Sequence, residues 1–309
     1  MKLSIVIPTY NEAENVGRLY SELLPVLKAL KHPYEIIYVD DGSTDGTRQK
    51  LRELNAKDRT AKILFHRRNF GQTAAMDTGF KYATGDVIIT MDADLQNDPA
   101  DIPKLLAKMN EGFDVVSGWR KYRKDPLGKK LFSRFAGLMR RMLTREKIHD
   151  SGCTLKAYRK ECFRGLDLYG EMHRYIPAIL TWRGYRVTEL VVNHRARQFG
   201  KSKYGMSRLF RGFLDLLVVK FWMQYSARPI HLFGGLGLSC FGLGFVAGLY
   251  LLVRKLFYAE SIANRPLLLL VVLLIILGVQ FFGMGVMTDA LTKIYYRTAP
   301  ISRVGETLE

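Results

Sequence analysis

The chain has 309 residues, of which 47 are Lys or Arg and 29 are Asp or Glu, so its formal net charge is +18. Apolar residues make up 48% of it, which excludes an intrinsically disordered chain, and the length excludes a single small module. Its three cysteines, Cys153, Cys162 and Cys240, form no CxxC pair and no metal-ligand spacing. This cysteine usage, together with an N-terminal apolar run too short for a secretory signal, favours a cytosolic location for the water-soluble part.

Short apolar runs alternate with helical patterns through the first 117 residues. The runs typical of strands buried on both faces are residues 3–7, 34–39, 62–65, 86–91 and 113–117. The segments that carry apolar residues at helical spacing are 12–30, 47–55, 72–83 and 99–109. This alternation predicts an α/β fold with a mostly parallel sheet, in which ligands bind beyond the carboxyl ends of the strands.

Polar residues follow three of these strands, at positions 8–12, 40–45 and 92–96. One such cluster alone is commonly a turn or a helix cap, but three clusters at one sheet edge indicate a binding site. Asp92 and Asp94 occupy alternate positions of an extended chain, so both carboxylates can face one hard cation. The pair therefore predicts a Mg²⁺ or Mn²⁺ site that is suited to carrying a diphosphate.

Other nucleotide and metal motifs are incomplete. Residues 200–202 read Gly-Lys-Ser, as at the end of a P-loop, but Arg195 stands at the earlier glycine position. Residues 235–237 read Gly-Leu-Gly, but Cys240 stands where a dinucleotide fingerprint needs its third glycine. The six histidines form no HExxH motif, which argues against a zinc hydrolase.

Basic residues gather in the middle of the chain. Between Arg120 and Arg164 there are fifteen Lys or Arg and four Asp or Glu, and residues 195–211 add six basic residues and no acidic one. A solvated helix face accounts for many of these charges, whereas a cluster beside a membrane attracts anionic lipid. Nucleic acid is the competing partner for such charge. The apolar segments that follow favour a membrane lipid and weigh against nucleic acid.

Two windows of 23 residues, 231–253 and 266–288, contain no Asp, Glu, Lys or Arg. At ~1.5 Å per residue each reaches ~35 Å against a hydrocarbon core of ~30 Å, so both windows predict transmembrane helices. Residues 207–228 mix apolar and charged side chains in a pattern typical of a helix at the membrane interface, and a core helix of the soluble domain is the alternative. The Gly244-xxx-Gly248 spacing favours close helix packing, and it also allows the spans to self-associate into a homo-oligomer.

The strand-end sequences together resemble those of the inverting family 2 glycosyltransferases of the GT-A fold. They are PTYNE at 8–12, VDDGSTD at 39–45 and MDADLQ at 91–96. Within that family the chain resembles the polyprenyl-phosphate glycosyltransferases, the group that includes dolichol-phosphate mannose synthase and the bacterial undecaprenyl-phosphate sugar transferases. Further matches, which extend over most of residues 1–210, are RNFGQ at 68–72, SGC at 151–153 leading to AYR at 157–159, and FGKSKYG at 199–205.

The resemblance implies transfer of a hexose from a UDP- or GDP-sugar to undecaprenyl or dolichyl phosphate, with inversion at the sugar. Processive relatives carry a QxxRW element that this sequence lacks, which implies transfer of a single sugar.

The resemblance also implies roles for individual residues. Those on the donor nucleoside would be Pro8, Tyr10, Glu12 and Asp40, with Asp41 nearby in the donor site. Those around the metal and the donor diphosphate would be Asp92, Asp94 and Gln96, with Arg120 close to the donor phosphates. Those on the acceptor phosphate would be Lys129, Ser133 and Lys203, where Lys129 replaces an Arg of the relatives and loses its bidentate geometry. Asp150 would be a catalytic residue that orients the acceptor or the sugar.

The predicted organisation is a catalytic domain over residues 1–206, an interfacial region at 207–229, a membrane hairpin at 230–289 and a cytosolic tail at 290–309. It predicts an integral protein of a bacterial or archaeal cytoplasmic membrane, with the catalytic domain in the cytosol. Two alternatives stay open: a glycosyltransferase of the same fold that acts on another lipid or glycan acceptor, and a catalytically silent membrane scaffold. The Asp92 and Asp94 pair weighs against the scaffold.

Overall fold

A computed structural model describes the chain except for residues 123–147, 196–206, 226–227, 259–260, 262–264 and 299–309. Its contacts divide it into two compact units, Met1–Lys220 and Phe221–Glu309, and each unit is described by itself.

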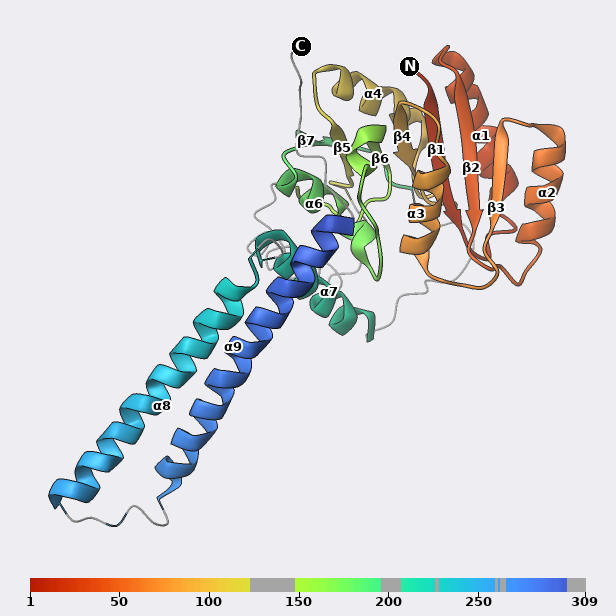
Figure 1. Ribbon diagram of the computed structural model, residues 1–309. Coiled ribbons are helices and arrows are strands. Elements are labelled where there is room, and N and C mark those ends of the chain that lie inside the picture. Colours follow the sequence, from red (N-terminus) through yellow and green to blue (C-terminus); the bar gives the residue numbers. More distant parts are fainter. Residues whose placement is uncertain (123–147, 196–206, 226–227, 259–260, 262–264, 299–309) are drawn as a thin grey trace. The chain divides into compact units, whose positions relative to one another are not determined.

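The first unit is built on a seven-stranded sheet with the strand order β3-β2-β1-β4-β6-β5-β7 (Figure 1). The strands are β1 (Leu3–Thr9), β2 (Tyr34–Asp40), β3 (Ala61–Phe65), β4 (Val87–Thr90), β5 (Val115–Trp119), β6 (Lys156–Arg159) and β7 (Val187–Val191). All neighbours are parallel except β6, which runs antiparallel to both β4 and β5. The predicted mostly parallel sheet is confirmed, and β6 and β7 join the five strands that the sequence predicts.

Of the four helices that the sequence predicts in this unit, two begin at the predicted residue and two begin later. The helices are α1 (Val16–Ala29), α2 (Thr47–Lys57), α3 (Gln72–Tyr82), α4 (Ile102–Asn110) and α6 (Ile176–Trp182). A helix is expected from residue 12, but residues 13–15 form a turn in which the Asn15 N–H donates to the Glu12 carbonyl oxygen at 2.9 Å, and α1 begins at Val16. Residues 99–101 form a 3₁₀ turn before α4, with the Asp98 side chain accepting a hydrogen bond from the Ala100 N–H.

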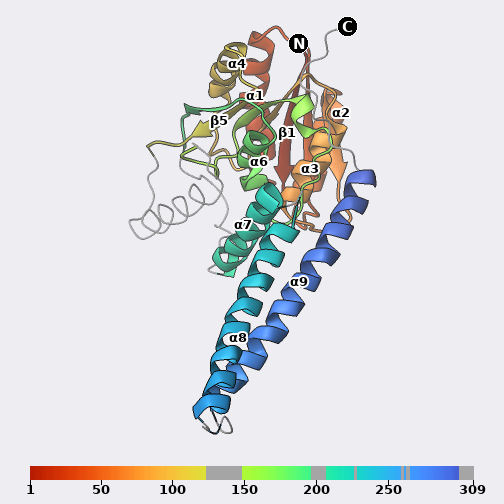
Figure 2. The same cartoon turned by 60° about the vertical axis from the view of Figure 1, so that its left-hand side comes forward.

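Helices cover both faces of the sheet. Buried side chains of α1, α2 and α4 join one hydrophobic core with Leu3, Ile5 and Ile7 of β1. Helix α3 lies on the opposite face, where a Cβ atom on Gly79 would stand 2.3 Å from the Val6 side chain, so only glycine permits this approach (Figures 1 and 2). Since strand residues alternate between faces, the odd-numbered side chains of β1 pack on the side of α1, α2 and α4, and Val6 packs on the side of α3.

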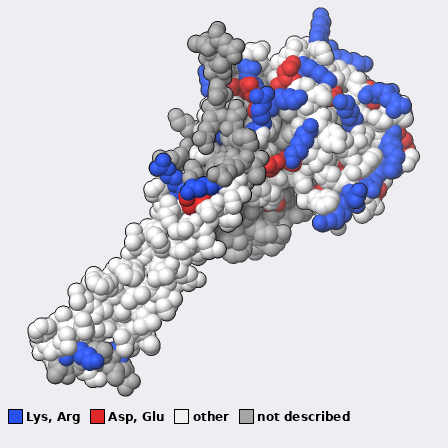
Figure 3. All heavy atoms as spheres, viewed as in Figure 1, with Lys and Arg blue, Asp and Glu red and all other residues white. Residues whose placement is uncertain are grey.

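The C-terminal part is helical. Helix α7 (Ser207–Tyr225) crosses the boundary between the units, and α8 (Ile230–Tyr258) and α9 (Pro266–Thr298) follow. Helices α8 and α9 each contain 29 residues long and apolar enough to cross a membrane, at 230–258 and 266–294, with 17% and 11% of their most apolar windows buried. A core helix of a soluble protein would be mostly buried, so this exposure fits lipid contact. Figure 3 shows an uncharged surface along this hairpin and Lys or Arg side chains where α8 and α9 are joined.

Small residues bring α8 and α9 together. A Cβ atom on Gly237 would stand 2.8 Å from the Gly278 carbonyl oxygen, so the two backbones are in direct contact. Gly244 and Gly248 also face α9 of the same chain, near Ile275 and Val271. The glycine pair that the sequence offers for self-association therefore serves packing within the hairpin.

Candidate active site

The carboxyl ends of β1, β2 and β4 lie side by side in the sheet, with Thr9 paired to Asp40 and Val6 paired to Thr90. The loops that follow β1 and β2 are tied together, because the Asn11 N–H donates to Ser43 Oγ at 2.8 Å. The Thr44 N–H donates in return to Asn11 Oδ1 at 2.8 Å. The polar clusters that the sequence places after these strands thus share one edge of the sheet.

The predicted nucleoside residues Pro8, Tyr10 and Glu12 lie at the end of β1 and in the loop after it, and all three are partly buried. The Glu12 carboxylate accepts a hydrogen bond from Asn15 Nδ2 at 2.6 Å, and its backbone N–H donates to Thr47 Oγ1 at 2.8 Å. These contacts hold the loop against the first turns of α1 and α2.

Asp40 and Asp41 are buried at the end of β2, and both hold neighbouring segments. Asp40 pairs with Arg48 Nε at 2.8 Å. Asp41 accepts hydrogen bonds from the backbone N–H groups of Phe70 and Gly71 at 2.9 and 2.8 Å, and its Oδ1 lies 2.9 Å from His66 Nδ1. Asp41 therefore shapes the loop that leads into α3.

Asp92 stands just beyond β4 and is held from two sides. Its Oδ1 accepts a hydrogen bond from Gln72 Nε2 at 2.8 Å, and its Oδ2 accepts one from Thr154 Oγ1 at 2.6 Å. Burial and the nearby negative charge of Asp94 raise the pKa of Asp92 to about 6. Two close carboxylates that repel each other in this way suit a divalent cation, whose charge relieves the repulsion.

Asp94 is buried, and its Oδ1 accepts a hydrogen bond from the Gln96 N–H at 3.1 Å. Among the described residues no group of three or more His, Cys, Asp or Glu side chains is arranged to hold a metal by itself. Two carboxylates are nevertheless the usual protein share of a Mg²⁺ site, which takes its other oxygens from phosphates and water. Asp92 and Asp94 fit such a site.

Arg120 follows β5 and forms a buried ion pair with Asp150. Its Nε and Nη2 atoms lie 2.7 and 3.0 Å from the two carboxylate oxygens of Asp150, and its Nη1 lies 3.4 Å from His194 Nε2. Burial lowers the pKa of Arg120, but the hydrogen bonds and charge of Asp150 outweigh that effect and raise the pKa above its ordinary value. The structure thus joins a predicted donor-phosphate residue to a predicted catalytic residue.

Lys156 is a buried cation behind this pair, with 2% of its surface exposed. Its ammonium donates hydrogen bonds to the backbone carbonyls of Ser151, at 3.0 Å, and Cys153. Burial lowers the pKa of Lys156 to about 8. Lys156 therefore fixes the turn that carries Asp150 and Thr154 into the site.

Asn97 also contacts Asp92, because its Oδ1 accepts a hydrogen bond from the Asp92 N–H at 3.0 Å. Several residues of this site were missed by sequence reasoning: Arg48, His66, Gln72, Asn97, Thr154 and Lys156. Gln72 ends the RNFGQ match and Lys156 lies between the SGC and AYR matches, but nothing in the sequence marks Gln72 as a partner of Asp92 or Lys156 as a buried cation. The predicted acceptor residues Lys129, Ser133 and Lys203 lie outside the described part of the chain.

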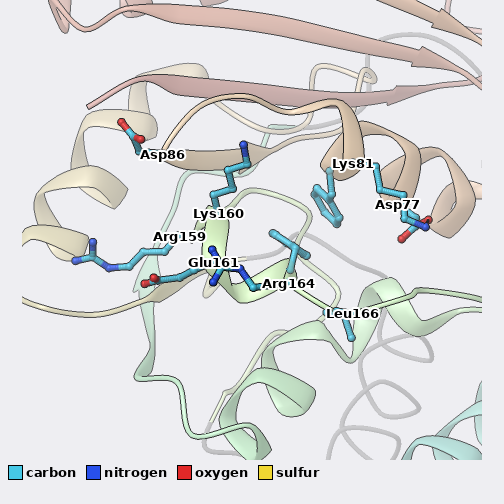
Figure 4. A pocket seen from close by; sticks show the side chains of 10 residues that line it. Asp77, Lys81, Asp86, Arg159, Lys160, Glu161, Arg164 and Leu166 are labelled. Atoms are coloured by element: carbon cyan, nitrogen blue, oxygen red, sulfur yellow. Dashed lines mark ion pairs between the residues drawn. The ribbon is translucent and has the colours of Figure 1, made fainter. Parts of the chain in front are cut away.

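A cavity of about 510 Å³ opens at the other end of the sheet (Figure 4). Its lining includes Asp86, just before β4, and Arg159, which pairs with the first residue of β4. None of the residues predicted for the active site lines this cavity. It is therefore separate from the edge that holds Asp92.

Comparisons with known proteins agree with this geometry. The family model described as glycosyl transferase family 2 matches residues 4–166. The chain is 42% identical over 302 residues to dodecaprenyl-phosphate galacturonate synthase of Rhizobium johnstonii, covering 96% of this chain and 89% of that one. It is 36% identical over 296 residues to undecaprenyl-phosphate 4-deoxy-4-formamido-L-arabinose transferase of Yersinia pestis, covering 95% and 89%.

Solved structures of low sequence identity share the fold. Glucosyl-3-phosphoglycerate synthase from Mycobacterium tuberculosis, in complex with Mn²⁺ and UDP-glucose, superposes with a TM-score of 0.54 at 19% identity, over 71% of this chain and 78% of that one. The predicted GT-A architecture is thereby confirmed. On the family match and the extent of the two relatives, the chain belongs to glycosyltransferase family 2.

Proposed function

We propose that this protein transfers a single sugar from a nucleotide sugar to a polyprenyl phosphate, with inversion at the anomeric carbon. The observation that carries the proposal is similarity along almost the whole chain, the two C-terminal apolar helices included, to proteins named for dodecaprenyl-phosphate and undecaprenyl-phosphate products. A transferase that acts only on soluble acceptors has no need of such a hairpin. A lipid acceptor lies in the bilayer, so a transferase that acts on it benefits from a membrane-spanning hairpin.

The chemistry requires little from a general base. A phosphate monoester has its second pKa near ~6, so the acceptor phosphate is already an anionic nucleophile at neutral pH. Its oxygen attacks the anomeric carbon in line with the bond to the donor diphosphate, and that bond breaks with its electron pair on the leaving nucleotide. Alignment of the two substrates and stabilisation of the leaving charge are then the main sources of rate.

The residues at the carboxyl edge of the sheet have different roles in this reaction. Asp92 and Asp94 would hold a divalent cation, Mg²⁺ or Mn²⁺, which when bound neutralises the diphosphate. Arg120, held by Asp150, offers a second positive charge to the donor phosphates. Pro8, Tyr10, Glu12 and Asp40 stand on the nucleoside side, while Asp41 supports the loop before α3.

The acceptor side is assigned to Lys129, Ser133 and Lys203, and the apolar hairpin to the bilayer. Along α7, Leu216 and Val219 are buried, whereas Leu217, Val218 and Trp222 are exposed. An exposed apolar face is what a helix at the membrane interface requires. A cytosolic catalytic domain gives access to nucleotide sugars, which supports the predicted orientation.

The test is a panel of UDP- and GDP-sugars assayed with purified enzyme against undecaprenyl phosphate, dolichyl phosphate, diacylglycerol and a soluble oligosaccharide. The proposal expects a polyprenyl-phosphate sugar from at least one donor and no product on the other two acceptors. Transfer to diacylglycerol or oligosaccharide alone would assign a different acceptor class. No turnover with any pair would favour a silent scaffold.

A further inference from the structure

The Asp92 carboxylate is held only by neutral hydrogen-bond donors among the contacts that the described residues make with it. The amide of Gln72 donates to Oδ1 at 2.8 Å and the hydroxyl of Thr154 donates to Oδ2 at 2.6 Å. The two cations nearby have other partners, because Arg120 pairs with Asp150 and the Lys156 ammonium donates to backbone carbonyls. A Lys or Arg side chain paired with the Asp92 carboxylate would compete with a metal ion, and the arrangement of Arg120 and Lys156 avoids such a pair.

The two donors come from opposite sides of the site. Gln72 is the first residue of α3, whereas Thr154 lies two residues before β6, so they reach Asp92 from segments 82 positions apart. A carboxylate has about four acceptor positions, and one donor on each oxygen leaves a further position on each. Because rotation of the carboxylate would break both hydrogen bonds, its plane is fixed while its remaining lone pairs stay available.

Asn97 adds a third contact that links the backbone of Asp92 to Thr154. Its Oδ1 accepts a hydrogen bond from the Asp92 N–H at 3.0 Å and lies 3.0 Å from Thr154 Oγ1. Asn97 is 3% exposed and Thr154 is 8% exposed, so water is largely excluded from these contacts. In such an environment a hydrogen bond is stronger than at the surface, and losing one leaves a polar group unsatisfied.

We propose that Gln72 and Thr154 are positioning residues that fix the Asp92 carboxylate in the orientation required for cation binding. The inference rests on the proposed role of Asp92 as a metal ligand. Neither residue contacts the cation in this proposal, and each acts through Asp92. Outer partners that orient metal ligands in this way typically contribute ~10- to 100-fold to metal affinity.

The test uses the full-length protein in detergent and measures Mn²⁺ binding by electron paramagnetic resonance with UDP present. Thr154→Val keeps the side-chain shape and removes the donor, and Gln72→Met keeps the length and removes the amide. We expect each variant to bind Mn²⁺ at least ~10-fold more weakly, and Thr154→Ser, which restores the hydroxyl, to remain within ~3-fold of wild type. The matched control is Thr73→Val, which removes a buried hydroxyl next to Gln72 that contacts Gly170 and His173.

The variant Asp92→Asn separates the proposed metal role of Asp92 from the proposed positioning role of Gln72 and Thr154. If Asp92→Asn binds Mn²⁺ as the wild type does, the metal role of Asp92 fails, and the positioning role fails with it. If Asp92→Asn loses the metal while Thr154→Val and Gln72→Met keep it, only the positioning inference is overturned. Equal loss in Thr73→Val would show a general packing defect and would also overturn it.

Discussion

The Arg120–Asp150 pair allows a quantitative test of what Asp150 does. Its two side chains are only 15% and 10% exposed, and two hydrogen bonds of 2.7 and 3.0 Å join them. Removing one partner of a buried pair typically costs ~3–5 kcal/mol, because the other charge is left without compensation. Since both groups retain some exposure, we expect Asp150→Asn to lower the free energy of unfolding by about 3 kcal/mol, which is about 150-fold in the unfolding equilibrium constant.

A double-mutant cycle isolates the pair. Asp150→Asn, Arg120→Met and the double variant are compared in detergent by denaturant unfolding, with tryptophan fluorescence as the signal. Trp119 stacks on His149 at a ring distance of 4.4 Å, so it reports on this region directly. We expect the double variant to be more stable than the sum of the single costs predicts, by at least ~1.5 kcal/mol, since contacting residues couple by ~0.5–3 kcal/mol. Additive costs would refute the reasoning.

Nucleotide binding in the same variants decides between two roles of Asp150. If Asp150 acts by holding Arg120, each single variant loses affinity for UDP or GDP, and the double variant loses no more than Arg120→Met. If Asp150 instead touches the sugar or the acceptor, the double variant loses turnover beyond either single variant while its nucleotide affinity matches that of Arg120→Met. Isothermal titration with the free nucleotide and steady-state kinetics separate these outcomes.

Three further predictions concern the metal, the acceptor and the stability of the sheet. Asp92→Asn should abolish most turnover with the fold intact, and EDTA should have the same effect on the wild type. Because the pKa of Asp92 is raised to about 6, protons compete with the cation below that pH, and the affinity for Mn²⁺ at pH 5 should be about tenfold lower than at pH 7.5. A Mn²⁺ affinity that does not change with pH would contradict this prediction. Lys129→Met or Lys203→Met should raise the KM for the acceptor while nucleotide affinity stays constant, and an equal loss of nucleotide affinity would move these residues to the donor side. Burial alone would raise the pKa of Glu35, but the Lys62 ammonium and the hydroxyl and amide donors lower it to about 2. Because the Lys62 side chain is 48% exposed, solvent screens the pair, and we expect the ionised form to contribute on the order of 1–2 kcal/mol of stability above pH 4.5, which is lost as the pH falls through 2. Glu35→Gln should lose this pH dependence in thermal unfolding, and an unchanged acid transition would sink the assignment.

The sheet could be predicted from the sequence because its first strands are apolar runs separated by regular helical patterns. Strands β6 and β7 were not predicted, since β6 has four residues that include a buried lysine and β7 is only partly buried. Their place in the sheet depends on pairing with β4 and β5, which is a tertiary effect.

The acidic residues of the site could be named from their position after strands, but not their partners. Contacts such as Gln72 with Asp92 and Arg120 with Asp150 join segments 20 and 30 residues apart. The groups that donate to Asp92, the Gln72 amide and the Thr154 hydroxyl, are uncharged, so no charge pattern in the sequence indicates these contacts. The resemblance located Arg120 and Asp150 separately, and only the three-dimensional arrangement shows that they form one unit.

The antiparallel course of β6 has an evolutionary consequence. Because β5 and β6 are antiparallel neighbours, with Val115 paired to Tyr158, the chain leaves the sheet after Trp119 and re-enters it at Lys156 on the same edge. That edge is the one where Asp92 lies. A connection that starts and ends at one edge can lengthen, shorten or be exchanged without changing strand order or register. If Lys129 and Ser133 bind the acceptor phosphate as proposed, relatives can change their acceptor through this connection while the catalytic sheet is retained, and grafting the connection between relatives would alter acceptor choice.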